Sequence, residues 1–439
     1  MLYRFFHIIL RFWMKIHFKR IFIQSLQEVP RKGAAILASN HPNSFLDAIV
    51  VALVLKRDIH FLVRSDVFRK PLAAAILKRL NMIPIYRLEE GAENLERNKG
   101  TFDRCNAILE KGGVILIFSE GNCVVEKRLR ALRKGTARIW FAAMEQRNWD
   151  NPIPVIPVGV NYTHPYYFRG ELLLNFGKAC SFGDLKAIWE NEPARAIRVF
   201  NEVLYEGMKS ELLIIPDHSA DEGAEVLLDF CRSEIRYPLL KSWYKEPHRF
   251  KQEKHFLDAL FKHPSKDAFI QDAEQTGKAI RKMNIAIAHV GKHMPRWQTL
   301  FLMVGFIPAT LSLFIHALPL WLTRRAVKKT KFHPKFRSSV MFGVAALSTY
   351  LVYLVLAVTL LFVDYRLLAL LIFIPRNTYM SLVWLDQLQL RRSRIQFALW
   401  KKEAPELAET IAMRRETLLL QSGMLGLTRK HNDVASKTE

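Results

Sequence analysis

The segment Ser339–Val363 contains no charged side chain and is long enough to cross the hydrocarbon core of a bilayer, which takes ~20 residues in a helix. Two further apolar runs flank it: Thr299–Leu322, which contains two prolines, and Leu367–Leu385, which contains a proline and an arginine. A buried hairpin in a large soluble domain would explain one such run, but hardly three in succession. The pattern therefore predicts membrane-embedded helices over residues 297–390.

Basic residues flank these runs and predict their orientation. The loop Arg324–Arg337 is strongly basic, and so is the start of the C-terminal tail at residues 391–439. Because basic flanks favour the cytoplasmic side, we expect the second and third runs to form a hairpin with Asp364–Arg366 outside. The first run would then enter and leave on one side as a bent, re-entrant helix. The domain at residues 31–215 is expected on the cytoplasmic face of the membrane.

Composition and charge exclude several classes of protein for this chain. The chain has 439 residues with 65 Lys and Arg against 41 Asp and Glu, a formal charge of +24, and 50% of its residues are hydrophobic. That hydrophobic content excludes intrinsic disorder, and the charge predicts an acidic partner surface. Because the basic residues flank apolar segments, we expect anionic lipid as the partner and no nucleic acid. The four cysteines form no CxxC pair, so neither a disulfide scaffold nor a cysteine-based zinc site is expected, and since the sequence shows no other zinc-ligand cluster, no metal site is expected.

The N-terminal residues 1–30 alternate basic and aromatic side chains. Arg4, Arg11 and Lys15 are interleaved with Phe5 and Trp13, and no apolar run here is long enough to span a bilayer. This pattern is typical of an amphipathic helix that lies in the membrane interface. A helix that packs against a protein core is the alternative interpretation.

Residues 31–215 alternate short apolar runs with helix-like segments, which is typical of a sheet covered by helices. Four runs are predicted as buried strands: Ala35–Ala38, His60–Val63, Val114–Phe118 and Val155–Val160. Three segments have helical spacing: Asp47–Leu55, Pro71–Leu80 and Gly100–Glu110. Residues 216–296 are polar and helix-like, with no clear strand signal.

One strand runs directly into a histidine. His41 follows the strand at Ala35–Ala38, and Asp47 lies near the start of the next helix. The carboxyl end of a strand is a usual position for a ligand site in an α/β sheet. His41 could act as a general base while Asp47 accepts its other ring N–H. The alternative is structural, because Ser44-x-x-Asp47 has the form of a capping box.

These residues belong to an ordered set of blocks that resembles the glycerolipid acyltransferases of the 1-acylglycerol-3-phosphate O-acyltransferase (lysophosphatidic acid acyltransferase) type. Five residues separate His41 from Asp47, where the family usually has four, and Cys123 replaces an arginine of the third block. The blocks occur in the family's order: Asn40-His41 with Asp47, Asn81–Arg87, Ile117–Asn122 and Val155–Val160.

The resemblance implies a role for each of seven residues. They are His41 as general base, Asp47 as its orienting partner, Arg87 as a contact to the acceptor phosphate, Glu120 as a ligand of an acceptor hydroxyl, Gly121 as a backbone donor near phosphate, Lys134 as a second positive charge, and Pro157 on the strand at the acyl-binding side. Judged from the residues alone, Arg87 could equally form a surface ion pair, Lys134 could face solvent, and Pro157 could belong to a core strand.

The implied fold is an α/β acyltransferase domain with an N-terminal interfacial helix, a helical middle segment and a C-terminal transmembrane helical region. The implied reaction moves a fatty acyl group from acyl-CoA or acyl-carrier protein to a hydroxyl of lysophosphatidic acid, with no further cofactor. Glycerol-3-phosphate is the alternative acceptor, and a non-catalytic lipid-binding membrane protein is the alternative function. The chain contains no GxSxG motif that would suggest a serine nucleophile.

Overall fold

The computed structural model describes residues 2–86, 98–235, 237–286, 295–329 and 336–424. The chain divides into two compact units, each assembled from segments that are distant in sequence. Unit 1 comprises residues 1–212, 243–247 and 327–343. Unit 2 comprises residues 213–242, 248–326 and 344–439.

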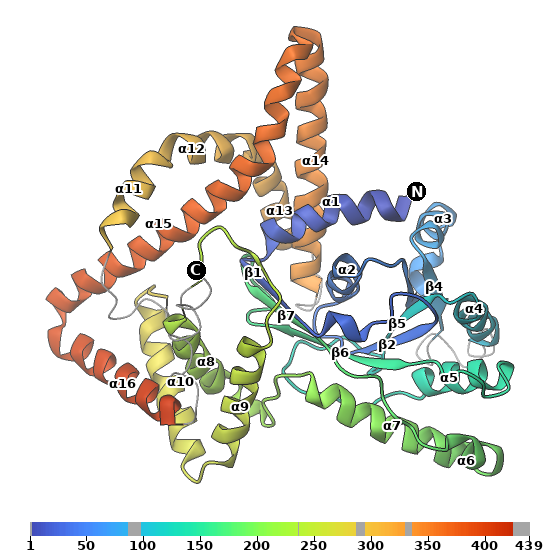
Figure 1. The fold of residues 1–439 in the computed structure, drawn as a ribbon. Coiled ribbons are helices and arrows are strands. Elements are labelled where there is room, and N and C mark those ends of the chain that lie inside the picture. The colour runs from blue at the N-terminus through green and yellow to red at the C-terminus, as the bar shows by residue number, and fades with distance from the viewer. Residues whose placement is uncertain (1, 87–97, 236, 287–294, 330–335, 425–439) are drawn as a thin grey trace. The chain divides into compact units, whose positions relative to one another are not determined.

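Unit 1 is built on an 8-stranded sheet with the order β4-β3-β5-β2-β6-β7-β1-β8 (Figure 1). Neighbouring strands are parallel except β6 and β7, which are antiparallel. The strands are β1 (Arg20–Gln24), β2 (Ala35–Ser39), β3 (Ile59–Arg64), β4 (Met82–Ile85), β5 (Val114–Phe118), β6 (Val155–Tyr162), β7 (Glu171–Phe176) and β8 (Trp243–Tyr244).

The central strands confirm the strand predictions. Every residue of β2 and β6 is buried, as expected for parallel strands covered on both faces, which read as continuous apolar runs. Ser39 at the end of β2 lies beside Phe118 at the end of β5. The loops that follow these two strands therefore leave the sheet at the same edge.

Helices cover both faces of this sheet. In the view of Figure 1, α1 and α2 lie above the sheet and α6 and α7 lie below it. The three predicted helices are confirmed to within two residues at each end. The helices of unit 1 are α1 (Leu2–His17), α2 (Phe45–Val54), α3 (Pro71–Arg79), α4 (Asn98–Glu110), α5 (Gly135–Gln146), α6 (Leu185–Asn191) and α7 (Pro193–Ser210).

Two expectations about unit 1 need correction. Residues 1–30 do not form one interfacial helix, because α1 ends at His17 and β1 follows as a sheet strand that pairs with β7 and β8. The segment 216–296 contains a strand, β8, although its two residues gave no signal in the sequence. Only the first half of α1 presents apolar side chains outward, with Phe5 and Ile8 exposed, whereas Trp13 is buried.

Unit 2 is helical. Its helices are α8 (Asp221–Glu234), α9 (His248–Lys262), α10 (Lys266–Lys282), α11 (Arg296–Val304), α12 (Phe306–Ile315), most of α13 (Ala317–Lys329), α14 (Arg337–Val363) from residue 344 onward, α15 (Phe373–Glu403) and α16 (Pro405–Met424). The first turns of α14 belong to unit 1.

The three apolar runs fold differently from one another. The run at Ser339–Val363 forms the single helix α14, and only 17% of the most apolar part of this helix is buried. The first run is broken into α11, α12 and α13, and α11 and α12 meet at Gly305 with a bend of 51°. The third run is divided between a 3-10 segment, Tyr365–Ile372, and α15, so our expectation of a third apolar helix is wrong. By length and composition, α14 could cross a membrane, and the bent pair would be a second span if it acts as one.

Candidate active site

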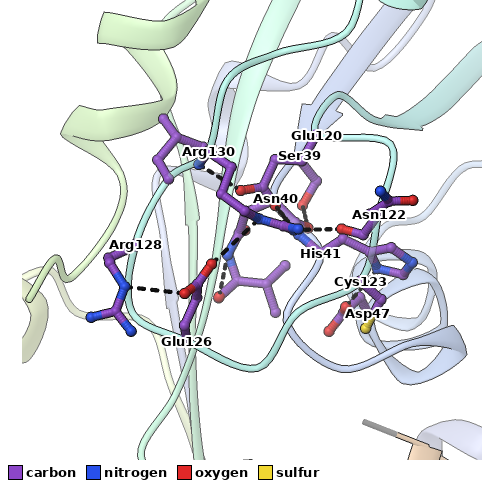
Figure 2. A network of polar contacts seen from close by, with 12 residues as sticks. Ser39, Asn40, His41, Asp47, Glu120, Asn122, Cys123, Glu126, Arg128 and Arg130 are labelled. Atoms are coloured by element: carbon purple, nitrogen blue, oxygen red, sulfur yellow. Dashed lines mark hydrogen bonds and ion pairs between the residues drawn. The ribbon is translucent and has the colours of Figure 1, made fainter. Parts of the chain in front are cut away.

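Two loops at the carboxyl edge of the sheet are tied together around His41. The backbone N–H of His41 donates to Glu120 Oε2 at 3.0 Å, and the backbone N–H of Val124 donates to the His41 carbonyl at 3.2 Å. The first loop follows β2 and the second follows β5, so the register of these two strands brings the first and third sequence blocks into contact. Figure 2 shows this cluster at close range.

His41 and Asp47 form the expected pair. His41 Nδ1 lies 2.9 Å from Asp47 Oδ2, and the carboxylate is fully buried while 15% of the imidazole is exposed. With Nδ1–H donating to the carboxylate, the other ring nitrogen, Nε2, is the one that can take a proton. The imidazole stacks on Phe118 with ring centroids 3.9 Å apart, which fixes the plane of the ring.

The five residues between His41 and Asp47 are three loop residues and the first two residues of helix α2. Helix α2 begins at Phe45, so Asp47 is in its first turn, and the residues before it form a turn that brings the carboxylate back to the imidazole. Ser44 does not cap the helix through its side chain. It has φ 49° and ψ −139°, a conformation that costs a residue with a side chain about 1–3 kcal/mol.

Asp47 accepts hydrogen bonds from two further groups. The backbone N–H of Asn43 donates to Oδ2 at 2.7 Å, and the hydroxyl of Tyr162, at the end of β6, donates to Oδ1 at 2.8 Å. Burial raises the pKa of Asp47, and the hydrogen bonds from these donors and from His41 oppose that shift. Burial and the neighbouring Asp47 also raise the pKa of Tyr162 well above its usual value, so the phenol keeps its proton and remains a donor.

Glu120 holds the backbone of the site. Its Oε1 accepts the backbone N–H of Arg130 at 2.9 Å, and its Oε2 accepts the guanidinium of Arg130 at 3.2 Å in addition to the His41 N–H (Figure 2). The side chain of Glu120 is only 3% exposed. The carboxylate therefore positions His41 and the loop after β5, while a contact to an acceptor hydroxyl stays a prediction.

The remaining predicted site residues are Gly121, Lys134, Pro157 and Arg87. Gly121 has φ 74°, and a Cβ at this position would lie 2.9 Å from Arg133, so the turn favours glycine. Lys134 is exposed at the start of α5. Pro157 lies midway along β6 and lines a separate cavity of about 460 Å³ together with residues of β7 and α7. Arg87 lies outside the described residues.

Sequence reasoning missed several residues of the site. Asn43 and Tyr162 bind Asp47, and Arg130 binds Glu120. Cys123 accepts the backbone N–H of Ser44 at 3.0 Å through its sulfur. The basic stretch after the third block was a usable signal for Arg130, because it follows the position where Cys123 replaces the family's arginine. Within the described part of the chain, no group of three or more His, Cys, Asp or Glu side chains could hold a metal ion.

Parts of this chain are similar to known proteins. Residues 20–161, from the start of β1 almost to the end of β6, match the acyltransferase family model. An uncharacterized acyltransferase of Schizosaccharomyces pombe is 28% identical over 112 residues, which are 25% of this chain and 16% of that protein. The crystal structure of the 1-acyl-sn-glycerophosphate (LPA) acyltransferase PlsC from Thermotoga maritima aligns with a TM-score of 0.33 and 15% identity, over 46% of this chain and 79% of that one.

The matched region contains both the His41–Asp47 pair and Glu120. The order of the sequence blocks, the contact between the loops after β2 and β5, and the match to the family model all lead to one assignment. Residues 20–161 form a domain that is similar to the acyltransferases, and this match supports an acyltransferase enzyme.

Proposed function

We propose that this chain is a membrane-bound O-acyltransferase of phospholipid biosynthesis, which moves a fatty acyl group from a thioester donor to a hydroxyl of lysophosphatidic acid. The observation that carries the proposal is the His41–Asp47 pair, in which a buried carboxylate orients a partly exposed imidazole. The donor is acyl-CoA or an acyl-carrier protein, and both supply an acyl thioester.

The proposed reaction is one direct transfer. His41 Nε2 takes the proton of the acceptor hydroxyl as the oxygen attacks the thioester carbonyl carbon, and Asp47 stabilises the imidazolium that forms. The tetrahedral intermediate collapses, the C–S bond breaks, and the leaving thiolate takes the proton back from His41. The products are the ester and a free thiol, so atoms and charge balance without a covalent enzyme intermediate.

Membrane attachment suits this reaction, because both the acceptor and the long-chain donor partition into lipid. The exposed apolar side chains on α1, Phe5 and Ile8, are accompanied by exposed arginines, an arrangement that suits an anionic lipid surface. The low burial of α14 supports a lipid-facing helix over a buried core helix. We place the catalytic domain on the cytoplasmic face, where the basic flanks of the apolar runs favour it.

The experiment measures acyl transfer by membranes that contain the full chain. Labelled acyl-CoA or acyl-carrier protein is offered with lysophosphatidic acid or glycerol-3-phosphate, and wild type is compared with His41→Ala. His218→Ala is the matched control, because His218 also pairs with an aspartate, Asp221, but its side chain is 87% exposed. We expect the His41 variant to lose about 10²–10⁴-fold in rate and the control to retain wild-type activity.

Each outcome of this experiment is informative. Transfer to glycerol-3-phosphate alone would replace the proposed acceptor and keep the mechanism. Inactive wild type with every donor and acceptor would refute the catalytic proposal in favour of a lipid-binding role. Equal rates for wild type and His41→Ala would refute the assignment of His41 as the base.

A further inference from the structure

The first turn of α14 contacts the loop that carries the proposed catalytic pair. Ser339 is fully buried, and its hydroxyl donates to the Asn43 carbonyl at 2.8 Å and accepts the backbone N–H of Leu46 at 3.2 Å. These two residues are the ends of the turn that precedes Asp47. A side chain that is 296 residues from Asn43 in sequence therefore bridges the turn from outside.

This turn needs support because its backbone is strained. Ser44, inside it, has a positive φ of 49°, a conformation that the surrounding contacts must enforce. Cys123 accepts the Ser44 N–H, and Asp47 accepts the Asn43 N–H from the inner side. The Ser339 hydroxyl bonds to the same two backbone groups from the outer side, where it adds to the hydrogen bond of 3.2 Å that the Leu46 N–H makes with the Asn43 carbonyl.

Two adjacent faces of the first turns of α14 contact different helices. Ser339 and Gly343 face α2, since a Cβ on Gly343 would lie 3.9 Å from the ring of Phe45. Phe342 packs edge-on against His17 of α1, with ring centroids 5.1 Å apart. Helical spacing thus directs one face of α14 to the catalytic loop and the adjacent face to the end of α1.

We propose that Ser339 is a positioning residue for the His41–Asp47 pair, acting through the turn Asn43–Leu46. The loop between His41 and Asp47 contains Ser44 at a positive φ, and the hydroxyl from α14 holds this turn so that the carboxylate meets the imidazole. This role rests on the proposed function of His41 as the base. It also makes the long apolar helix a part of the catalytic architecture as well as a candidate membrane anchor.

The test compares Ser339→Ala with Ser338→Ala in the purified full chain. Ser338 is a matched control: it lies in the same turn and is 2% exposed, but its hydroxyl faces His17. We expect Ser339→Ala to lower kcat by about 10–100-fold with KM for both substrates within about twofold, because a small displacement of a reacting group is costly. Ser338→Ala is expected to stay within about twofold of wild type in both constants.

A double-mutant cycle separates positioning from a merely structural effect. If Ser339 acts through Asp47, Ser339→Ala costs less than about threefold in an Asp47→Ala background, since no side chain remains there to be positioned against His41. The same cost in both backgrounds would overturn the proposal, and so would a wild-type kcat for Ser339→Ala. If the alanine variant does not fold, Ser339→Cys against Ser338→Cys gives the same comparison with little change in volume.

The outcomes also separate this inference from the proposed function. An active wild type with an unaffected Ser339→Ala refutes the role of Ser339 alone. A wild type with no transfer activity on any pair of substrates refutes the proposed function, and the role of Ser339 with it.

Discussion

Each of the two units contains a buried carboxylate, and the pKa values of these two carboxylates shift in opposite directions. In unit 1, Asp47 is bound by an imidazole, a backbone amide and a phenol. In unit 2, Glu253 on α9 is 1% exposed and forms ion pairs with Arg232 and Arg249. Burial would raise the pKa of Glu253, but the charges and hydrogen bonds of these two arginines lower it to about 2.

The difference separates a carboxylate with a proposed catalytic role, Asp47, from a structural one, Glu253. Burial raises the pKa of Asp47, and its hydrogen bonds and the neighbouring His41 only partly oppose this shift, so ionisation of this carboxylate lowers the stability of the fold. Two guanidiniums already neutralise Glu253, so its charge stabilises unit 2. Glu120 is the intermediate case, with one guanidinium, from Arg130, beside two backbone N–H groups.

The largest expected effect on stability follows from Glu253→Gln. This change removes the buried partner of Arg249 and one of the three carboxylates that pair with Arg232, so we expect the free energy of unfolding to fall by about 3–5 kcal/mol. Urea denaturation of the full chain measures it. The matched control is Glu225→Gln, which removes a more exposed partner of Arg232 at 3.2 Å and is expected to cost less than about 1 kcal/mol. Equal losses for the two variants would contradict the structural role of Glu253.

We expect the contribution of Glu253 to the free energy of unfolding to disappear in acid, over a defined pH range. Its pKa is about 2 in the fold and about 4.3 in an unfolded chain, so its contribution is complete above about pH 4.3 and disappears as the pH falls toward 2. The stability difference between wild type and Glu253→Gln should shrink by about 3 kcal/mol over this range. Denaturation curves at several pH values measure this, and a difference that does not change below pH 4 would contradict it.

A smaller effect, on kcat, is expected when the ion pair of Glu120 is removed. Arg130→Gln removes the guanidinium from Glu120 but keeps both backbone N–H groups, so we expect kcat to fall about tenfold, the equivalent of one charge-assisted hydrogen bond. Arg128→Gln, which removes a cation that pairs with Glu126 in the same loop, is the control and should change kcat less than threefold. A larger loss for the control would place Arg128, and not Arg130, nearer to the chemistry.

Much of unit 1 could be predicted from the sequence because local patterns determine it. Buried parallel strands read as apolar runs, so β2, β3, β5 and β6 were predictable, whereas β1 continues a basic and aromatic stretch that resembles a helix. The His41–Asp47 pair was predictable from a short loop. Its support was not, since Ser339 is 296 residues from Asn43, and no periodicity links residues so far apart.

The broken apolar runs show a second limit of sequence reasoning. The prolines in the first run suggested a bend, but the break between α11 and α12 lies at Gly305, and Pro308 occupies the first turn of α12, where a missing N–H costs no helical bond. The indole of Trp384, on α15, donates to the Leu302 carbonyl next to this break. This hydrogen bond comes from a residue outside the first run, so the sequence of that run alone does not predict it.

The most direct test of the contrast between the carboxylates is to measure kcat and the melting temperature of Asp47→Asn on one preparation. The amide oxygen can accept the His41 and Asn43 N–H groups, and the amide NH₂ can face the Tyr162 hydroxyl, so the geometry is kept while the charge is lost. We predict a loss in kcat of at least about 10²-fold. At neutral pH the melting temperature should equal or exceed that of wild type, because a raised pKa means that the ionised carboxylate opposes folding. A kcat within threefold of wild type, or a melting temperature lowered as far as in Glu253→Gln, would contradict the account.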